Sequence, residues 1–121
     1  MDIKKLHLVY FSPTGTTQSI LRAAAKYFST EIVEHDLTDY GARKVQLELG
    51  EDDFVFIGSP VYGGRVPETF RERLKDIKGR RTPAALIITY GNREYEDALL
   101  EMKDISEENG FFPIGAAAIV T

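Results

Sequence analysis

The sequence predicts an α/β domain in which a parallel sheet of five strands lies between two layers of helices. Short apolar runs that end in turn residues alternate along the chain with segments whose apolar residues repeat at helical spacing. Such alternation produces a mostly parallel sheet, because right-handed crossovers place the helices on both of its faces. With 121 residues, the chain has the size of one domain.

Five segments are predicted as strands because each is a short apolar or alternating run bounded by turn residues. The second of them is the most polar, which predicts a position at an edge of the sheet. The fifth is rich in alanine, which predicts close cover by neighbouring elements. The predicted strands are residues 6–11, 31–37, 53–58, 84–90 and 112–120.

Helices are predicted after the first, third and fourth strands, where apolar residues repeat every three or four positions. Pro67 suits the first turn of the second of these helices, and Gly79 is expected to end it. Asn109 and Gly110 are expected to end the last one. The three apolar faces are Ile20, Ala24 and Phe28, then Phe70, Leu74 and Ile77, and then Ala98, Leu99, Met102 and Ile105.

Residues 38–50 are the least regular interval of the sequence. Val45, Leu47 and Leu49 alternate like a strand, although a crossover helix is expected at this place in a parallel sheet. We therefore predict a short helical turn or an irregular segment, so that the second helix of the usual alternation is reduced.

Three loops carry the residues that indicate function. In an open parallel sheet, ligands bind beyond the carboxyl ends of the strands. The loops after the first, third and fourth strands are residues 12–17, 59–66 and 91–95, and they are rich in Gly, Pro, Ser, Thr and Tyr. No histidine or carboxylate occurs in them before Glu94, so no catalytic residue is assigned.

The first of these loops has the composition of a phosphate site. It reads Ser12-Pro13-Thr14-Gly15-Thr16-Thr17, which places several hydroxyl groups and a flexible glycine at the start of a helix. No Asp or Glu occurs in residues 6–28, so the positive end of that helix is free for an external anion. An ordinary helix cap, the alternative, needs only one such residue. The glycine motifs of NAD sites and of nucleoside triphosphate sites are absent.

The order strand, Ser-x-Thr-Gly-x-Thr, helix resembles the FMN phosphate loop of flavodoxins. Residues 51–67 resemble the second flavin loop of that family, most closely in the flavodoxin-like domain of bacterial flavodoxin/ferredoxin fusion proteins, and residues 89–95 resemble the third. The resemblance covers essentially the whole chain. It implies a flavodoxin-like three-layer sandwich with strand order 2-1-3-4-5, and FMN as the cofactor. The cofactor-binding residues that it implies are Ser12, Thr14, Gly15, Thr16, Thr17, Ser59, Pro60, Val61, Tyr62, Gly63, Gly64, Thr89, Tyr90, Gly91, Asn92 and Tyr95.

The resemblance also suggests how the flavin ring is held. Its aromatic walls would be Tyr62 together with Tyr90 or Tyr95, and a glycine peptide of the second loop would lie near the ring. The chain has no tryptophan, although flavodoxins often place one in the second loop. Arg65 leaves two alternatives open, because it could lie beside the flavin and stabilise the reduced form or could face solvent.

Composition excludes several other classes. With 15 basic and 19 acidic side chains, the net charge of -4 does not attract nucleic acid or anionic lipid. The absence of cysteine excludes a disulfide, a thiolate zinc site and an iron–sulfur cluster held by this chain alone.

His7 and His35 have no acid or histidine at ligand spacing, so we interpret both as structural. The apolar run 6–11 is too short for a signal peptide or a membrane span, which predicts a cytoplasmic protein.

Two functional classes remain after these exclusions. One is an FMN electron carrier, and the other is an FMN-dependent NAD(P)H:quinone or flavin reductase. A reductase needs an additional wall for its substrate, and the loops here are short, so the carrier is favoured. A flavin-free interaction module is disfavoured because all three loops look intact.

Partners are suggested by charge and by length. Residues 65–81 carry seven basic and three acidic side chains, and residues 93–108 carry two basic and seven acidic ones. We interpret most of this charge as solvated helix face, with a docking surface for a redox protein as the alternative. The predicted elements fill the chain without the fifth helix of flavodoxins. We therefore expect that the sequence is a piece of a longer protein, with a ferredoxin module in cis or trans, or that a homodimer covers the gap.

Overall fold

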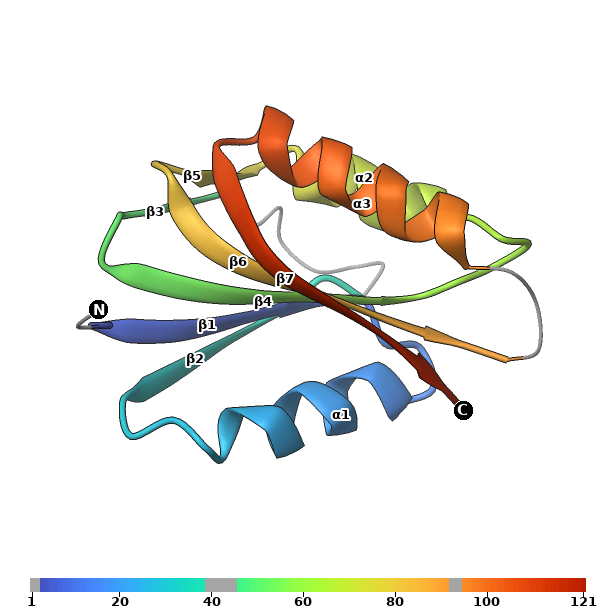
Figure 1. Cartoon of the computed structure of the whole chain (residues 1–121), viewed down its shortest axis with the longest axis horizontal. Helices are drawn as coiled ribbons and strands as arrows, with labels where there is room; N and C mark the ends of the chain where they lie inside the picture. Colours follow the sequence, from blue (N-terminus) through green and yellow to red (C-terminus); the bar gives the residue numbers. More distant parts are fainter. Residues whose placement is uncertain (1–2, 39–45, 92–94) are drawn as a thin grey trace.

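The most apolar segments of the chain form the centre of a parallel sheet. The computed structural model describes residues 3–38, 46–91 and 95–121. In it, β1 (Lys5–Tyr10), β4 (Asp53–Pro60) and β6 (Thr82–Tyr90) lie side by side, with β2 (Glu31–Asp36) at one edge and β7 (Phe111–Val120) at the other. All four neighbouring pairs are parallel (Figure 1). The order β2-β1-β4-β6-β7 confirms the predicted topology, including the edge position of the polar second strand.

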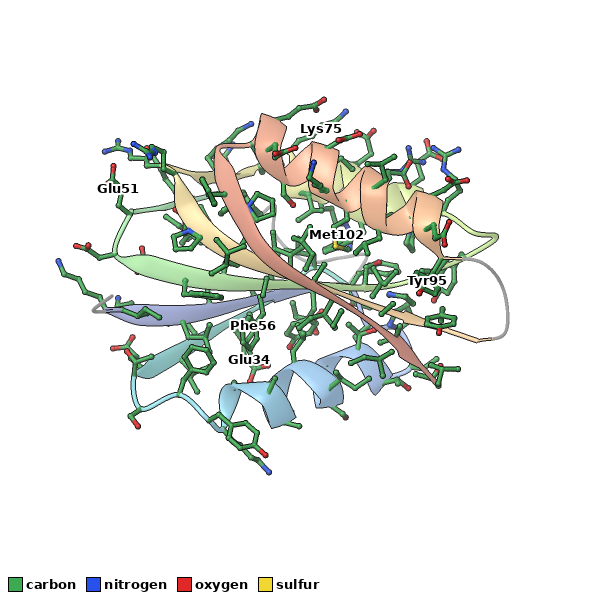
Figure 2. The ribbon with its side chains drawn as sticks, in the orientation of Figure 1. Glu34, Glu51, Phe56, Lys75, Tyr95 and Met102 are labelled. Atoms are coloured by element: carbon green, nitrogen blue, oxygen red, sulfur yellow. The ribbon has the colours of Figure 1, made fainter. Side chains whose placement is uncertain are left out.

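Helices cover both faces of this sheet, as predicted. Helix α1 (Thr16–Ala25) lies alone on one face, and α2 (Glu68–Leu74) and α3 (Glu96–Glu108) lie together on the other (Figure 1). Two apolar clusters result, one between each helical layer and the sheet. Figure 2 shows Phe56 between β4 and α1, and Met102 between α3 and the sheet.

A close contact sets the position of α1 on the sheet. A Cβ atom added at Gly58 of β4 would lie 2.8 Å from a methyl group of Leu21 and 2.9 Å from the methyl group of Thr17. The glycine therefore lets the helix lie directly on the strand, because any larger residue would push α1 outward. This contact fixes the beginning of α1 above the carboxyl end of β4.

A second, two-stranded sheet corrects the prediction for two segments. Leu47–Leu49 form β3 and Ile77–Gly79 form β5, and the two strands pair in parallel. The apolar spacing was predicted to extend the helix as far as Ile77, but α2 ends at Leu74 and the chain is extended by Ile77. Ile77 and Leu49 are both buried. The strand pair therefore buries the apolar side chain of Ile77, as the predicted helix would have done. The helical turn or irregular segment was predicted for residues 38–50; of these, residues 39–45 lie outside the described residues and 47–49 form β3.

The alanine-rich strand β7 differs from its prediction. Close cover was expected, but residues 115–117 are exposed in the middle of the strand. Alanine is small enough for a strand that neighbouring elements cover closely. It is equally compatible with an uncovered strand, because its short side chain exposes little apolar surface to water. In the described part of the chain, no helix is long and apolar enough to span a membrane.

Candidate functional site

Three loops meet at the carboxyl ends of β1, β4 and β6 and enclose a cavity. Its volume is about 220 Å³. We call it the three-loop cavity, and its lining residues are Ser12, Pro13, Thr14, Thr16, Thr17, Pro60, Val61, Tyr62, Thr89, Tyr90, Gly91 and Thr121. The sheet topology therefore brings the three sequence motifs together.

The first loop presents the start of α1 to this cavity. Gly15 has a φ of 84°, in the left-handed region, and its amide donates to the carbonyl of Ser12 at 3.1 Å. The hydroxyl of Ser12 accepts the amide of Gln18 at 3.0 Å. Within the described residues, the amides of Thr16 and Thr17 have no hydrogen-bond acceptor, as is usual for the first turn of a helix.

The electrostatic character of this loop suits an anion. The first turn of α1 contains no acidic residue, so the positive end of the helix is not neutralised by the chain itself. The hydroxyl of Thr14 donates to that of Thr16 at 3.3 Å, which keeps both hydroxyls at the mouth of the turn. Unbonded amides together with hydroxyl groups at a helix start form a binding site for phosphate or carboxylate.

A buried pair of hydroxyl groups joins the first loop to the third. Thr17 and Thr89 both line the cavity, and their hydroxyl oxygens are 3.1 Å apart. Both residues are buried, so neither hydroxyl would find water in place of its partner. The hydrogen bond therefore fixes the start of α1 relative to the end of β6.

The second loop begins with two backbone links that position its aromatic residue. The amide of Val61 donates to the carbonyl of Thr89 at 2.9 Å, and Tyr62 and Arg65 exchange two backbone hydrogen bonds across a tight turn. Gly63 and Gly64 occupy the centre of that turn with φ values of 59° and 80°. Tyr62 is half exposed at the edge of the cavity.

The carboxylate of Glu101 on α3 holds the rest of this loop. Its oxygens accept from the guanidinium of Arg65 at 2.5 Å and from the amide of Val66 at 3.0 Å, and Arg71 lies 3.5 Å away. Partial burial alone would raise the pKa of Glu101, but the bonds from Arg65 and Val66 outweigh it and the pKa lies below its ordinary value. The structure thus pairs Arg65 with Glu101 and does not place it in the lining of the cavity.

The third loop supplies a pair of tyrosine rings. Tyr90 lines the cavity, and the ring of Tyr95 lies behind it with a centroid separation of 4.5 Å and an interplanar angle of 37°. Tyr95 also packs against the core under α3 (Figure 2). The packed second ring holds Tyr90 in place, although Tyr95 itself does not line the cavity.

Ten of the sixteen residues implied by the family resemblance line the cavity; the others are near it or fall outside the description. Gly15 forms the turn before α1, and Ser59 is buried with its hydroxyl donating to the carbonyl of Pro60 at 2.8 Å. Gly63, Gly64 and Tyr95 shape the loops without lining the cavity, and Asn92 lies outside the described residues. The ten are Ser12, Thr14, Thr16, Thr17, Pro60, Val61, Tyr62, Thr89, Tyr90 and Gly91.

Two lining residues were not predicted. Pro13 belongs to the first loop but was not among the implied cofactor-binding residues. Thr121 follows β7, and its amide donates to the carbonyl of Tyr90 at 2.8 Å. The predicted strand order could have indicated Thr121, since it places the carboxyl end of the fifth strand beside that of the fourth.

Neither histidine lines the cavity; His7 lies on β1 and His35 on the neighbouring β2. The fold brings them together, although they are 28 positions apart in the sequence: Nδ1 of His7 is 2.9 Å from Nε2 of His35, and Asp53 is 3.5 Å from His7. Burial lowers the pKa of His7, and burial together with the nearby His7 lowers the pKa of His35 to about 4. Among the described residues, no cluster of three or more His, Cys, Asp or Glu side chains has the arrangement of a metal site.

Comparison with known proteins agrees with this geometry. Residues 7–110 match the model of a protein family described as a flavodoxin domain. No curated protein matches the chain in sequence at a significant level.

Solved structures share the fold at low sequence identity. The Flv1 flavodiiron core from Synechocystis has a TM-score of 0.69 and 14% identity over 98% of this chain, which spans 31% of the length of that protein. A two-electron reduced flavodoxin from Megasphaera elsdenii has a TM-score of 0.69 and 22% identity, covering 94% of this chain and 85% of the other. A flavodoxin variant from Fusobacterium nucleatum bound to flavin mononucleotide has a TM-score of 0.69 and 15% identity, covering 93% and 68%. At these identities, the likeness shows the fold.

Proposed function

Because this chain belongs to the flavodoxin domain family, we propose that it binds FMN non-covalently at the three-loop cavity and carries electrons between protein partners. The observation that carries the proposal is the meeting of an anion site with aromatic side chains in one cavity. Unbonded amides and hydroxyls of the first loop suit a phosphate group, and Tyr62 and Tyr90 suit a flat ring. Bound FMN would supply the redox chemistry, which none of the described side chains supplies.

The residues of the cavity fit the two parts of FMN separately. At about 220 Å³, the cavity lies below the range of about 300–1,000 Å³ of typical pockets for small molecules. We therefore assign it to the phosphate end, held by Ser12, Thr14, Thr16 and Thr17. The ring would rest between Tyr62 and Tyr90 at the open edge, where Tyr62 is half exposed.

An open edge suits an electron carrier, since a partner protein can reach the flavin there. A ferredoxin or a ferredoxin-like module, in cis or in trans, is the partner that we propose. The first turn of α3 begins right after the third loop, and its Asp97 offers negative charge to such a partner. A cytoplasmic location stays a prediction of the sequence.

The phosphate assignment can be tested with one added charge. In Thr16→Asp, the new carboxylate would lie at the phosphate position, so we expect FMN affinity to fall by about 100-fold or more because like charges repel in a partly enclosed site. An acidic residue in the first turn favours the helix itself, so the loss would not come from unfolding of α1. FMN fluorescence quenching on addition of apoprotein measures the affinity.

Ser19→Asp is the matched control. It adds the same charge to the same helix at an exposed position outside the cavity lining, and affinity should change by less than about threefold. Equal affinity of Thr16→Asp and the control would contradict the phosphate assignment. Rapid oxidation of NAD(P)H by the FMN-loaded protein alone would contradict the carrier and favour the reductase.

A further inference from the structure

Strand β7 is an edge without charged side chains, and after Pro113 and a shift of its register against β6, residues 115–120 form its regular part. It has ten residues and pairs only with β6 in the described part of the chain, so half of its backbone groups face outward. Residues 110–121 include no ionisable side chain. Phe112, Ile114 and Val120 are each more than half exposed. A long, apolar edge strand of this kind is a template for pairing with another strand.

An apolar groove runs beside this strand on the α3 side. Its volume is about 430 Å³, and its walls include Leu99, Leu100, Pro113 and Ala116. Leu100 is more than half exposed, although it lies on a helix that otherwise packs on the sheet. The groove and the edge are continuous, so one partner could cover both.

The charges along the groove indicate what that partner is. Glu96 and Lys103 both border it, seven residues and therefore about two helical turns apart on α3. A two-fold axis perpendicular to the sheet, at Ala117 of β7, would place two copies of α3 antiparallel on the same face. Glu96 of each copy would then lie toward Lys103 of the other, so these two groups at the groove would be complementary in charge. In the single chain Lys103 lies 3.5 Å from Glu107, and in the dimer it would be shared between Glu107 and the Glu96 of the second copy.

We propose that this chain forms a homodimer in which the β7 strands of two copies pair antiparallel and the two α3 helices close the groove between them. The interface is isologous, because the same surface is used by both copies. It buries Leu100 and the exposed edge of β7, and it joins the two sheets into one, with five strands from each copy. The uncharged strand lets the two backbones approach without repulsion, unlike the rest of a chain with a net charge of -4.

This dimer does not depend on the proposed cofactor. The antiparallel pairing places the carboxyl ends of the two β6 strands at opposite ends of the joined sheet. The two three-loop cavities would then lie far apart, and each would stay open to a partner. Dimerisation and flavin binding can accordingly be tested separately.

Sedimentation velocity over a concentration series tests the dimer directly. We expect the wild-type chain to show a concentration-dependent dimer, and Ala117→Asp to be a monomer at the same concentrations, because the new charges of two copies would meet at the centre of the pairing. Ala117 is exposed, so the substitution leaves the core intact, which far-UV circular dichroism can confirm. A wild-type chain that stays monomeric at all concentrations overturns the proposal.

A charge-exchange series tests the antiparallel arrangement. Lys103→Glu and Glu96→Lys should each weaken the dimer by about tenfold, since each places like charges opposite one another. The double variant restores opposite charges and should recover the affinity to within about threefold. Failure of the double variant to recover would overturn the antiparallel arrangement.

Tyr27→Glu provides the control for these charge changes. Tyr27 is 90% exposed and follows the last residue of α1 by two positions, and α1 lies on the opposite face of the sheet from α3 (Figure 1). The substitution removes exposed apolar surface and adds charge away from β7. It should leave the dimer unchanged, and weakening comparable to that of Lys103→Glu would contradict the proposed interface.

Discussion

The two edges of the sheet are built in opposite ways. In β2, four of the six residues are ionisable, namely Glu31, Glu34, His35 and Asp36, whereas β7 has none among its ten. Charged side chains on an edge discourage pairing with other strands, and β7 lacks this protection. The comparison teaches that β2 is held by side-chain contacts within the chain, whereas for β7 we propose completion by a second copy.

A network of side chains closes the β2 edge against α1. The hydroxyl of Tyr10 donates to Glu34 at 2.8 Å and accepts from the side-chain amide of Gln18 at 2.7 Å, while Arg22 of α1 donates to Glu34 at 2.9 Å. Figure 2 shows Glu34 directed from β2 toward α1. Burial and the bond to Glu34 raise the pKa of Tyr10 to about 12, so its proton stays in place at all physiological pH values. β2 thus depends on specific polar contacts.

The largest loss of folding stability is expected where β7 enters the core. Phe111 is 5% exposed in the cluster under α3, whereas its neighbour Phe112 is 55% exposed. Phe111→Ala should lower the free energy of unfolding by about 3 kcal/mol through lost burial and a new cavity, and Phe112→Ala by less than about 1 kcal/mol. Urea denaturation at concentrations that keep the chain monomeric measures both. Similar losses in the two variants would show that β7 is not held mainly by its first residue.

An intermediate effect is expected from the network at β2. Tyr10→Phe removes one hydroxyl with two hydrogen bonds, one of them to a carboxylate, and should lower the free energy of unfolding by about 1–2 kcal/mol. Tyr27→Phe removes a hydroxyl in water and serves as the control, with no change expected. Hydrogen exchange should become faster at β2 and stay the same at β7 in Tyr10→Phe. Equal acceleration at both edges would contradict a local role of the network.

The smallest effect is a pH dependence confined to the β2 side. Below pH 6.5 the unfolded chain takes up a proton at His35, and the folded chain, in which burial and His7 hold the pKa near 4, does not. The free energy of unfolding should therefore fall as the pH decreases from 6.5 toward 4, by about 1 kcal/mol between pH 7 and pH 5 after allowance for partial exposure of the ring. His35→Gln should remove at least half of this decrease in urea denaturation. A variant as sensitive to acid as the wild type would assign the effect to other groups.

Much of this architecture could be predicted from local patterns. The apolar runs of β1, β4 and β6 are long enough to identify buried parallel strands, and the Ser and Thr residues around Gly15 mark the first loop. The polar residues of β2 correctly indicated an edge. These features depend on residues close together in the sequence, so a local sequence pattern was enough to predict them.

What could not be predicted depends on pairs that are distant in the sequence. The three-residue strands β3 and β5 are too short for a periodic signal, and each is stable only beside the other. The contact between His7 and His35 follows from the register of β1 against β2. This register pairs His35 with Val9, and His7 lies two residues before Val9 on the same strand. The bond between Thr17 and Thr89 joins residues 72 positions apart.

Glu101 has a consequence for the energetics of ligand binding. Its bonds to Arg65 and Val66 hold the second loop against α3 in the protein alone. The conformational entropy of that loop is therefore lost when the chain folds, and a ligand that later contacts Tyr62 would not have to order it. A carboxylate on a helix outside the cavity thus lowers the entropic cost of binding inside it.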